Sequence, residues 1–379
     1  MAVSIEPFPA PFVLSLINKP ALNTAIAAIA ADPALTGLCA GVVDLSGPSY
    51  AGFNDDDMLY VGSLQKICAM YVAFELRSRV RQQVAAAIAD GLSTSKTGWH
   101  LAVIKDLESA WQPKLTAAFP KPLPAGFPKL NDIFTFTNTG DVNFSSNGES
   151  QADLDHRETK NGTDGIAHGD ISGLKFFELL KQMLRWSNNQ AAGRCVLALS
   201  YPYINGVLKG AGFFDRASAG PPATPARGLW MSGSYTGSDW LAKDAAGIAL
   251  SPRWAKAQDR RVTNFAGTAR QVACLMMLLA QDKLVTDPSN PDVNKEIRDV
   301  LSGTHGIGSY LASALRSGGR PFDEVFSKIG WGNDTRRHDC GIVERTVAGT
   351  KVRYAVAGLG GDNNLVSLSK LFVEIDKAI

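Results

Sequence analysis

A serine and a lysine three residues apart form the most reactive combination in the sequence. Ser63 and Lys66 stand in Ser-Leu-Gln-Lys, where apolar residues begin to recur at helical spacing. Residues three apart on a helix share a face, so the amine can reach the hydroxyl. Serine attacks well only when a base takes its proton, and lysine is a base only when desolvation or a second cation lowers its pKa. The pair predicts Ser63 as nucleophile and Lys66 as its base; a helix cap is the plainer interpretation of Ser63.

Two later motifs supply groups that this chemistry also needs. Ser187 begins Ser-Asn-Asn directly after an amphipathic segment, and Lys328 begins Lys-Ile-Gly in the first of the late strands. Lys328 could be the second cation, and Ser187 could pass a proton from the lysines to the leaving group. The ordinary alternatives are a helix cap for Ser187 and a solvated strand residue for Lys328.

Residues beside these motifs predict how a substrate is bound. Asn189 would face the site together with Ser187, while Gly330 and Trp331 continue the third motif along its strand. An edge strand laid beside the start of a helix directs one backbone amide toward it. We therefore expect the N–H groups of Ser63 and Trp331 to form an oxyanion hole.

Strand signals lie at both ends of the chain, with helical signals between them. Residues 38–62 contain two short β-branched or aromatic runs separated by turn residues, and residues 328–360 contain three more. Strands from both ends can share one antiparallel sheet, so the sequence predicts an α+β fold. We expect a sheet domain from residues 1–80 plus 246–379, and a mainly helical inserted lobe with long polar loops from residues 81–245.

Apolar spacing also predicts individual helices and loops. Helices are expected over residues 21–31, 63–80, 172–186, 187–200, 268–285, 295–303 and 365–379. Residues 91–170 carry few signals of regular structure. Within them, residues 138–155 are dense in Asn, Asp, Ser and Gly but lack the spacing of a calcium loop, which predicts a long polar surface loop. Residues 216–254 predict another loop region.

The composition is that of a soluble globular protein. The chain has 379 residues, 45% of them hydrophobic and 20% charged, with a formal net charge of +2, so nothing indicates nucleic-acid binding. The five cysteines contain no Cys-x-x-Cys pair, which predicts free thiols. The five histidines lack metal-binding spacing, and no dinucleotide or phosphate-binding glycine motif occurs, so we expect no metal and no cofactor. His338 could approach the site from just after the third motif, although a structural role is the plainer interpretation.

The beginning of the chain does not read as a targeting segment. It has no basic stretch followed by a long apolar one, and no apolar run approaches the about 18 residues that span a bilayer. We therefore expect a cytoplasmic protein without membrane contact, or a periplasmic or secreted one if a signal has been removed. The oligomeric state is left open.

The three motifs, in this order, resemble those of the serine β-lactamase and penicillin-binding-protein (DD-peptidase) superfamily, closest to the class A β-lactamase-like serine hydrolases. Residues 39–66, 184–199 and 268–285 extend the resemblance. It implies a β-lactamase/transpeptidase-like fold, in which helices flank an antiparallel sheet and an all-helical lobe is inserted. It also implies a metal-free hydrolase that forms an acyl-enzyme from an amide or ester.

The motifs depart from the family at two positions. Asn188 replaces an aspartate, which is tolerable because its two neighbours face the site. Ile329 replaces a threonine or serine whose hydroxyl helps the family bind the substrate carboxylate, which argues against ordinary penicillin or D-Ala-D-Ala recognition. Arg336 or Arg337 could supply a carboxylate contact instead, or could be solvated charges in a turn.

The glutamate that completes hydrolysis in class A β-lactamases is also missing. These enzymes carry it in the loop after the second motif, whereas here no glutamate occurs between Glu178 and Glu296. Efficient class A β-lactamase activity is therefore not expected. Asp215, Asp239 or Asp244 could replace that base, and the spacing favours none of them.

A second assignment of the middle motif is open. Tyr203 begins Tyr-Ile-Asn, which resembles the second motif of class C β-lactamases and of many esterases of this fold. Tyrosine would then be the partner of the base, in a carboxylesterase. We favour Ser187, because its Trp-Ser-Asn-Asn-Gln-Ala-Ala context matches the helix that presents the motif.

Two functions of different classes follow. The first is a serine hydrolase acting on a small-molecule or peptide-like acyl substrate. The second is a catalytically weak or inactive member that binds a ligand, which Ile329 and the missing glutamate favour. Neither nucleic acid nor a membrane is expected as a partner.

Overall fold

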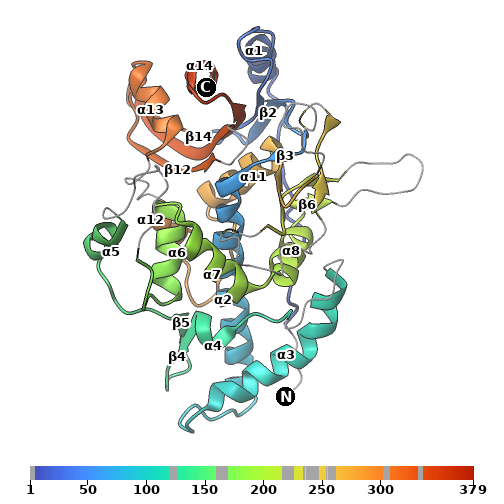
Figure 1. Cartoon of the computed structure of the whole chain (residues 1–379), viewed down its shortest axis with the longest axis vertical. Helices are drawn as coiled ribbons and strands as arrows, with labels where there is room; N and C mark the ends of the chain where they lie inside the picture. Colours follow the sequence, from blue (N-terminus) through green and yellow to red (C-terminus); the bar gives the residue numbers. More distant parts are fainter. Residues whose placement is uncertain are drawn as a thin grey trace, which may run out of the picture.

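Strands from both ends of the chain form one antiparallel sheet of five strands (Figure 1). Its order is β12 (Glu324–Trp331), β13 (Arg337–Val347), β14 (Thr350–Gly361), β1 (Cys39–Asp44) and β2 (Ser49–Phe53). Because β1 pairs with β14, Cys39 lies opposite Leu359. The α+β fold with an antiparallel sheet is therefore confirmed.

The computed structural model describes most of the chain. The described residues are 5–118, 126–158, 170–215, 226–233, 235, 247–252, 254, 262–301, 308–331 and 336–379. Within these ranges, no helix is both long and apolar enough to cross a membrane.

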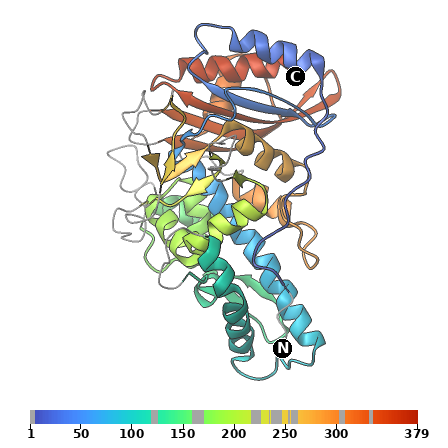
Figure 2. The same ribbon diagram turned by 90° about the vertical axis from the view of Figure 1, so that its right-hand side faces the viewer.

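Helices cover both faces of the sheet (Figure 2). The outer face carries α1 (Pro20–Ala30), α13 (Tyr310–Ser317) and α14 (Val366–Ala378), and the inner face carries α11 (Ala269–Ala280). Successive residues of a strand point to opposite faces. Val42 accordingly packs in the outer core with Phe372, while Val43 packs in the inner core.

The long helix α2 (Lys66–Ala89) leads from the sheet into the helical lobe (Figure 1). Most of its residues are buried, because the other helices pack around it. These are α3 (Trp99–Ala118), α6 (Phe176–Arg185), α7 (Asn189–Leu199), α8 (Tyr201–Gly210) and α12 (Val293–Leu301). A continuous helix rather than a linker joins sheet and lobe, and the division of the chain near residues 80 and 245 stays a prediction.

The segment 91–170 holds more regular structure than its sequence indicates. It contains α3, α4 (Leu130–Ile133), β4 (Phe134–Phe136), β5 (Val142–Phe144) and α5 (Gln151–Glu158). The expectation of one polar loop over residues 138–155 is wrong, because β5 packs in the core and a helix begins at Gln151.

Short strands complete the described structure. They are β3 (Leu59–Tyr60), β11 (Phe265–Gly267) and β8 (Trp230–Met231) in one sheet, β6 (Phe214–Asp215) with β7 (Arg227–Gly228), and β9 (Ile248–Ala249) with β10 (Val262–Thr263). The first of these sheets lies against the segment that leads into α2, because Val61 N donates a hydrogen bond to Phe265 O at 3.1 Å.

The buried carboxylate of Asp376 holds α14 to the sheet. It accepts a hydrogen bond from Tyr354 Oη at 2.8 Å and pairs with the guanidinium groups of Arg320 and Arg345. Asp376→Ala removes the acceptor of all three groups while they stay buried or half-buried. We expect the free energy of unfolding, measured in urea, to fall by about 3–5 kcal/mol.

The adjacent Lys377→Ala is the matched control. Its ion pair with Glu374 is largely exposed, so its removal should change the free energy of unfolding by less than about 1 kcal/mol. Equal losses in the two variants would contradict the structural role of Asp376.

Candidate active site

Three segments far apart in the sequence converge at the beginning of α2. The 3-10 turn η1 (Gly62–Gln65) carries Ser63, the link between α6 and α7 carries Ser187, and the edge strand β12 carries Lys328. The α-helix itself begins only at Lys66, with no side-chain cap. The helix-cap interpretation of Ser63 is therefore wrong.

Two glycines allow the turn and the strand to touch. Gly62 has a φ of +51°, and a Cβ on it would lie 2.6 Å from the carbonyl oxygen of Trp331. A Cβ on Gly330 would lie 2.6 Å from the carbonyl oxygen of Val61. Only glycine fits such close backbone contacts. The main chain of Trp331 thus lies directly beside the turn of Ser63, while the oxyanion hole formed by their amides stays a prediction.

The amine of Lys66 lies at the centre of the site. Its Nζ atom is 3.1 Å from Ser63 Oγ and 3.1 Å from Ser187 Oγ. It also donates hydrogen bonds to the carbonyl oxygen of Ser187 and, at 2.8 Å, to Asn189 Oδ1. Lys66 is fully buried, whereas the two serines and Asn189 are partly exposed. The buried amine is therefore directed at the hydroxyls of two partly exposed serines.

Ser187 connects the two lysines. Lys328 Nζ lies 2.9 Å from Ser187 Oγ and donates a hydrogen bond to the carbonyl oxygen of Ile329 at 3.0 Å. A continuous chain of contacts thus runs from Ser63 through Lys66 and Ser187 to Lys328. Because a hydroxyl both donates and accepts, Ser187 is able to relay a proton along it.

Burial controls the charge of the second lysine. Desolvation lowers the pKa of Lys328 to about 8, although the nearby Asp339 and Cys340 oppose the shift. Burial also raises the pKa of Asp339 to about 6, against hydrogen bonds from Leu311 N and Ser309 Oγ that favour the carboxylate. Lys328 is consequently charged near pH 7 and loses its charge at mildly alkaline pH. It is not the solvated strand residue that the alternative interpretation supposed.

In the middle motif, one residue caps a helix and its two neighbours contact Lys66. Asn188 Oδ1 accepts a hydrogen bond from Ala191 N at 3.0 Å and so caps α7. Its neighbours Ser187 and Asn189 both contact Lys66. Ser187 has a φ of +55°, a left-handed conformation that is uncommon outside glycine.

Ile329 and His338 are buried beside the third motif. Ile329 lies opposite Asp339 in β13, and its side chain brings no polar group to the site. His338 Nδ1 accepts a hydrogen bond from Gly360 N at 3.1 Å, and burial lowers its pKa to about 3. His338 therefore stays neutral at physiological pH, which supports its structural interpretation.

The two arginines at the beginning of β13 have different surroundings. The guanidinium carbon of Arg337 lies 4.3 Å from the ring centre of Trp331, whose side chain is 40% exposed. Arg336 instead donates a hydrogen bond to Gly360 O at 2.9 Å and lies over the buried ring of Trp254. Arg337 is thus the arginine at the exposed edge of the site.

Tyr235 belongs to the site, although no motif indicates it. Lys66 Nζ lies 4.9 Å from the centre of its ring, which packs on Phe265 with 4.6 Å between ring centroids. Burial raises the pKa of the Tyr235 hydroxyl well above its usual value, so the phenol stays neutral. The ring therefore packs near the end of the Lys66 side chain and helps to hold it in place. Its only sequence signal is an aromatic residue within a segment rich in Gly and Ser.

Tyr203 does not join the site. It lies on α8 in the core of the helical lobe, where its ring stacks on Trp111 with centroids 6.0 Å apart. Its electrostatic neighbours are Arg79 and Glu75, and Glu75 stands nine residues, about 13 Å, along α2 from Lys66. The assignment of Tyr203 as partner of the base is therefore wrong.

The three aspartates considered for the deacylating base receive no support. Asp215 is exposed on β6, where it lies opposite Arg227. Asp239 and Asp244 lie outside the described residues. Among the residues that the structure describes, no three His, Cys, Asp or Glu side chains gather closely enough to hold a metal ion.

Comparisons with known proteins give similarity in fold only. No protein-family model matches the sequence, and no curated protein matches it. Among solved structures, the chain is similar to the TLA-3 extended-spectrum β-lactamase, with 12% identity over 94% of this chain and 96% of that chain and a TM-score of 0.48.

Two further similar structures are β-lactamases of named bacteria. The one from Burkholderia phymatum is 12% identical over 94% of this chain and 98% of that chain, with a TM-score of 0.48. A class A β-lactamase from Mycobacterium abscessus is 13% identical over 94% of this chain and 97% of that chain, with a TM-score of 0.47. Similarity of this degree carries no information about activity, so the function is argued below from the contacts of the site.

Substitution of Gly62 tests the contact between the turn and β12. Gly62→Ala places a Cβ against the backbone of Trp331 at an unfavourable φ, so the free energy of unfolding should fall by about 1–3 kcal/mol. Gly37→Ala is the control, because its Cβ would meet nothing within 4 Å and its change should stay within about 0.5 kcal/mol. Denaturant unfolding of both variants measures the difference, and an unaltered Gly62→Ala protein would contradict the close approach.

Proposed function

We propose that the protein is a β-lactamase-like serine hydrolase that cleaves an ester or amide through an acyl-enzyme on Ser63. One observation carries the proposal: Lys66 Nζ lies 3.1 Å from the hydroxyl oxygens of both Ser63 and Ser187. The base thereby contacts both the proposed nucleophile and the proposed proton relay, as nucleophilic catalysis requires.

The contacts of Lys66 suit a neutral amine that acts as a base. Such an amine has two hydrogens and one lone pair. The carbonyl oxygen of Ser187 and Asn189 Oδ1 can accept the two hydrogens. The lone pair can then accept the proton of Ser63, whose Oγ lies 3.1 Å from Nζ.

Acylation of Ser63 requires two proton transfers in addition to the attack. Ser63 Oγ attacks the acyl carbon while its proton passes to Lys66 Nζ. Lys66 gives a proton to Ser187, and Ser187 gives its own proton to the leaving group. The bond between the acyl carbon and the leaving group then breaks. Backbone amides of Ser63 and Trp331 would stabilise the negative oxygen that forms meanwhile.

Hydrolysis of the acyl-enzyme is expected to be the slow step. The sequence contains no glutamate between Glu178 and Glu296, the stretch that would supply a deacylating base. The acyl group should therefore stay on Ser63 long enough to be detected. A protein that binds a ligand without cleaving it is the second candidate, favoured by the apolar Ile329 in the third motif.

Intact mass after reaction with a fluorophosphonate tests the nucleophile. The wild-type protein should gain one phosphonyl group with loss of fluoride, and Ser63→Ala should gain none. Ser313→Ala, which removes an exposed hydroxyl on α13, is the control and should react as the wild type does. With p-nitrophenyl acetate, a burst of one nitrophenol per protein should precede slower turnover.

The alternatives give different results in the same experiment. Labelling of Ser63→Ala at the wild-type rate would remove Ser63 as the nucleophile. An unlabelled wild-type protein that also leaves the ester intact would favour the ligand-binding candidate.

The charge of Lys328 predicts a pH dependence that an anionic acyl donor reveals. Lys328 is a cation below its pKa of about 8 and is neutral above it, so attraction of a carboxylate in the donor fades as the pH rises. The acylation rate of an anionic aryl ester, divided by that of a neutral one, should fall about tenfold between pH 7 and pH 9. Lys328→Arg keeps its charge and should flatten this ratio. A flat ratio in the wild type would exclude Lys328 as an anion-binding group.

A further inference from the structure

Ser187 stands in a backbone conformation that its own residue type disfavours. Its φ of +55° lies in the left-handed region, which at the end of a helix is usually occupied by glycine. Glycine would bring no hydroxyl between Lys66 and Lys328. The chain therefore needs contacts from outside the link to keep a serine in this position.

The preceding helix α6 provides only part of this restraint. The backbone N–H groups of Trp186 and Asn188, on either side of Ser187, both donate to the carbonyl oxygen of Gln182, at 3.3 and 3.2 Å. One acceptor shared by two donors at these lengths makes two weak hydrogen bonds. A further support is required to fix the link.

Helix α5 binds the side chains of Trp186 and Gln182. Asp155 Oδ1 accepts a hydrogen bond from Trp186 Nε1 at 2.9 Å, and also from Gln151 Nε2 at 2.7 Å. The carbonyl oxygen of Leu154 accepts one from Gln182 Nε2 at 2.8 Å. The bond to Trp186 is the stronger kind, because its acceptor is a carboxylate. It lies one residue before Ser187.

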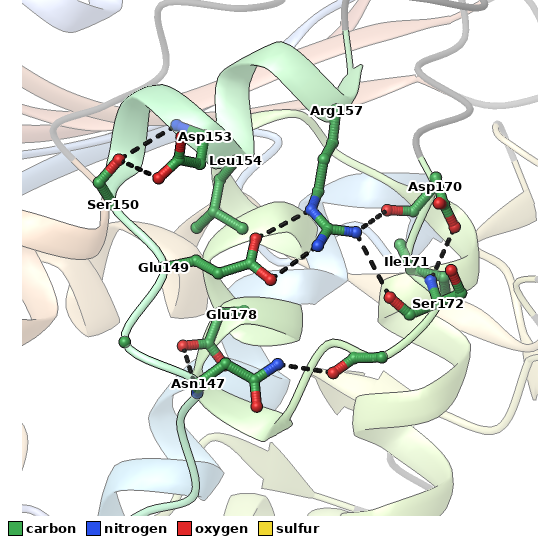
Figure 3. A network of polar contacts seen from close by, with 12 residues as sticks. Asn147, Glu149, Ser150, Asp153, Leu154, Arg157, Asp170, Ile171, Ser172 and Glu178 are labelled. Atoms are coloured by element: carbon green, nitrogen blue, oxygen red, sulfur yellow. Dashed lines mark hydrogen bonds and ion pairs between the residues drawn. The ribbon is translucent and has the colours of Figure 1, made fainter.

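A polar network anchors α5 in turn (Figure 3). Arg157 makes a bidentate pair with Glu149 at 2.9 and 2.7 Å, and its guanidinium also reaches the carbonyl oxygens of Asp170 and Ser172. Leu154 is fully buried between these contacts and α6. Because α5 is held on both flanks, it can serve as a fixed support for the link.

We propose that Asp155 is a positioning residue, which through Trp186 holds the hydroxyl of Ser187 between the two lysines. The proposal depends on the proposed function only for its kinetic test. In that reaction, a misplaced Ser187 fails in one step, the delivery of a proton to the leaving group.

Two acetate esters isolate that step. The p-nitrophenolate of the first ester is a stable anion and leaves without a proton. The phenoxide of phenyl acetate is more basic, so its departure is helped by a proton. Asp155→Ala should therefore slow acylation by phenyl acetate at least about tenfold, and acylation by p-nitrophenyl acetate less than about threefold. Asp155→Asn keeps the acceptor Oδ1 and should stay within about threefold of the wild type with both esters.

Two further variants distinguish positioning from general damage. Asp153 lies on the same helix, and its side chain contacts the exposed Ser150. Asp153→Ala should therefore change neither rate. Asp155→Ala should add no further loss to a protein that already carries Ser187→Ala, because both changes disable the same relay. Equal slowing with both esters, or additive losses in the double variant, would overturn the proposal.

A crystal structure of Asp155→Ala tests the positioning role without an activity measurement. Ser187 Oγ should leave hydrogen-bond distance of Lys66 or Lys328 as the link relaxes out of the left-handed region. An unchanged φ with both lysine contacts intact would overturn the inference. If the wild-type protein reacts with neither ester, the proposed function fails, and this structural result still decides the role of Asp155.

Discussion

The structure depends on placing two lysine amines around one serine hydroxyl inside the protein. Lys66 and Lys328 have no exposed surface, yet Ser187 Oγ lies within 3.1 Å of the first and 2.9 Å of the second. Two buried cations so close would repel each other, so at least one favours its neutral form. Desolvation of the buried amine lowers the pKa of Lys328 to about 8.

The need to bring both amines to one hydroxyl explains backbone features that are unfavourable in themselves. Gly62 and Gly330 carry no side chain, because β12 must approach the turn of Ser63 at van der Waals distance. Ser187 accepts a left-handed conformation so that its hydroxyl reaches both amines. The rest of the helical lobe, including α5, supplies the rigidity that these local departures require.

The sequence predicts the side chains that meet at the site better than the residues that support them. Ser63, Lys66, Ser187 and Lys328 have reactive side chains at motif spacing, and the antiparallel sheet follows from β-branched runs at both ends of the chain. Helix α3 was missed among Pro, Gly and polar signals nearby, although buried apolar residues recur on it every four positions from Trp99. Tyr235 and Asp155 could not be found, because only the tertiary fold brings a lone tyrosine to Lys66 and an aspartate to Trp186. Tyr203 shows the reverse error, since a local motif resembled a site but its side chain packs in a core.

The order of the strands has a consequence for synthesis on the ribosome. Strand β1 emerges early but pairs with β14, and Lys328 reaches the site on β12, whose neighbours β13 and β14 complete the sheet. Ser63 and Lys66 are therefore made long before the rest of their site exists. Because β14 ends at Gly361, the contact of Lys328 with Ser187 can form only after that residue has left the exit tunnel, and its formation therefore marks the completion of the sheet.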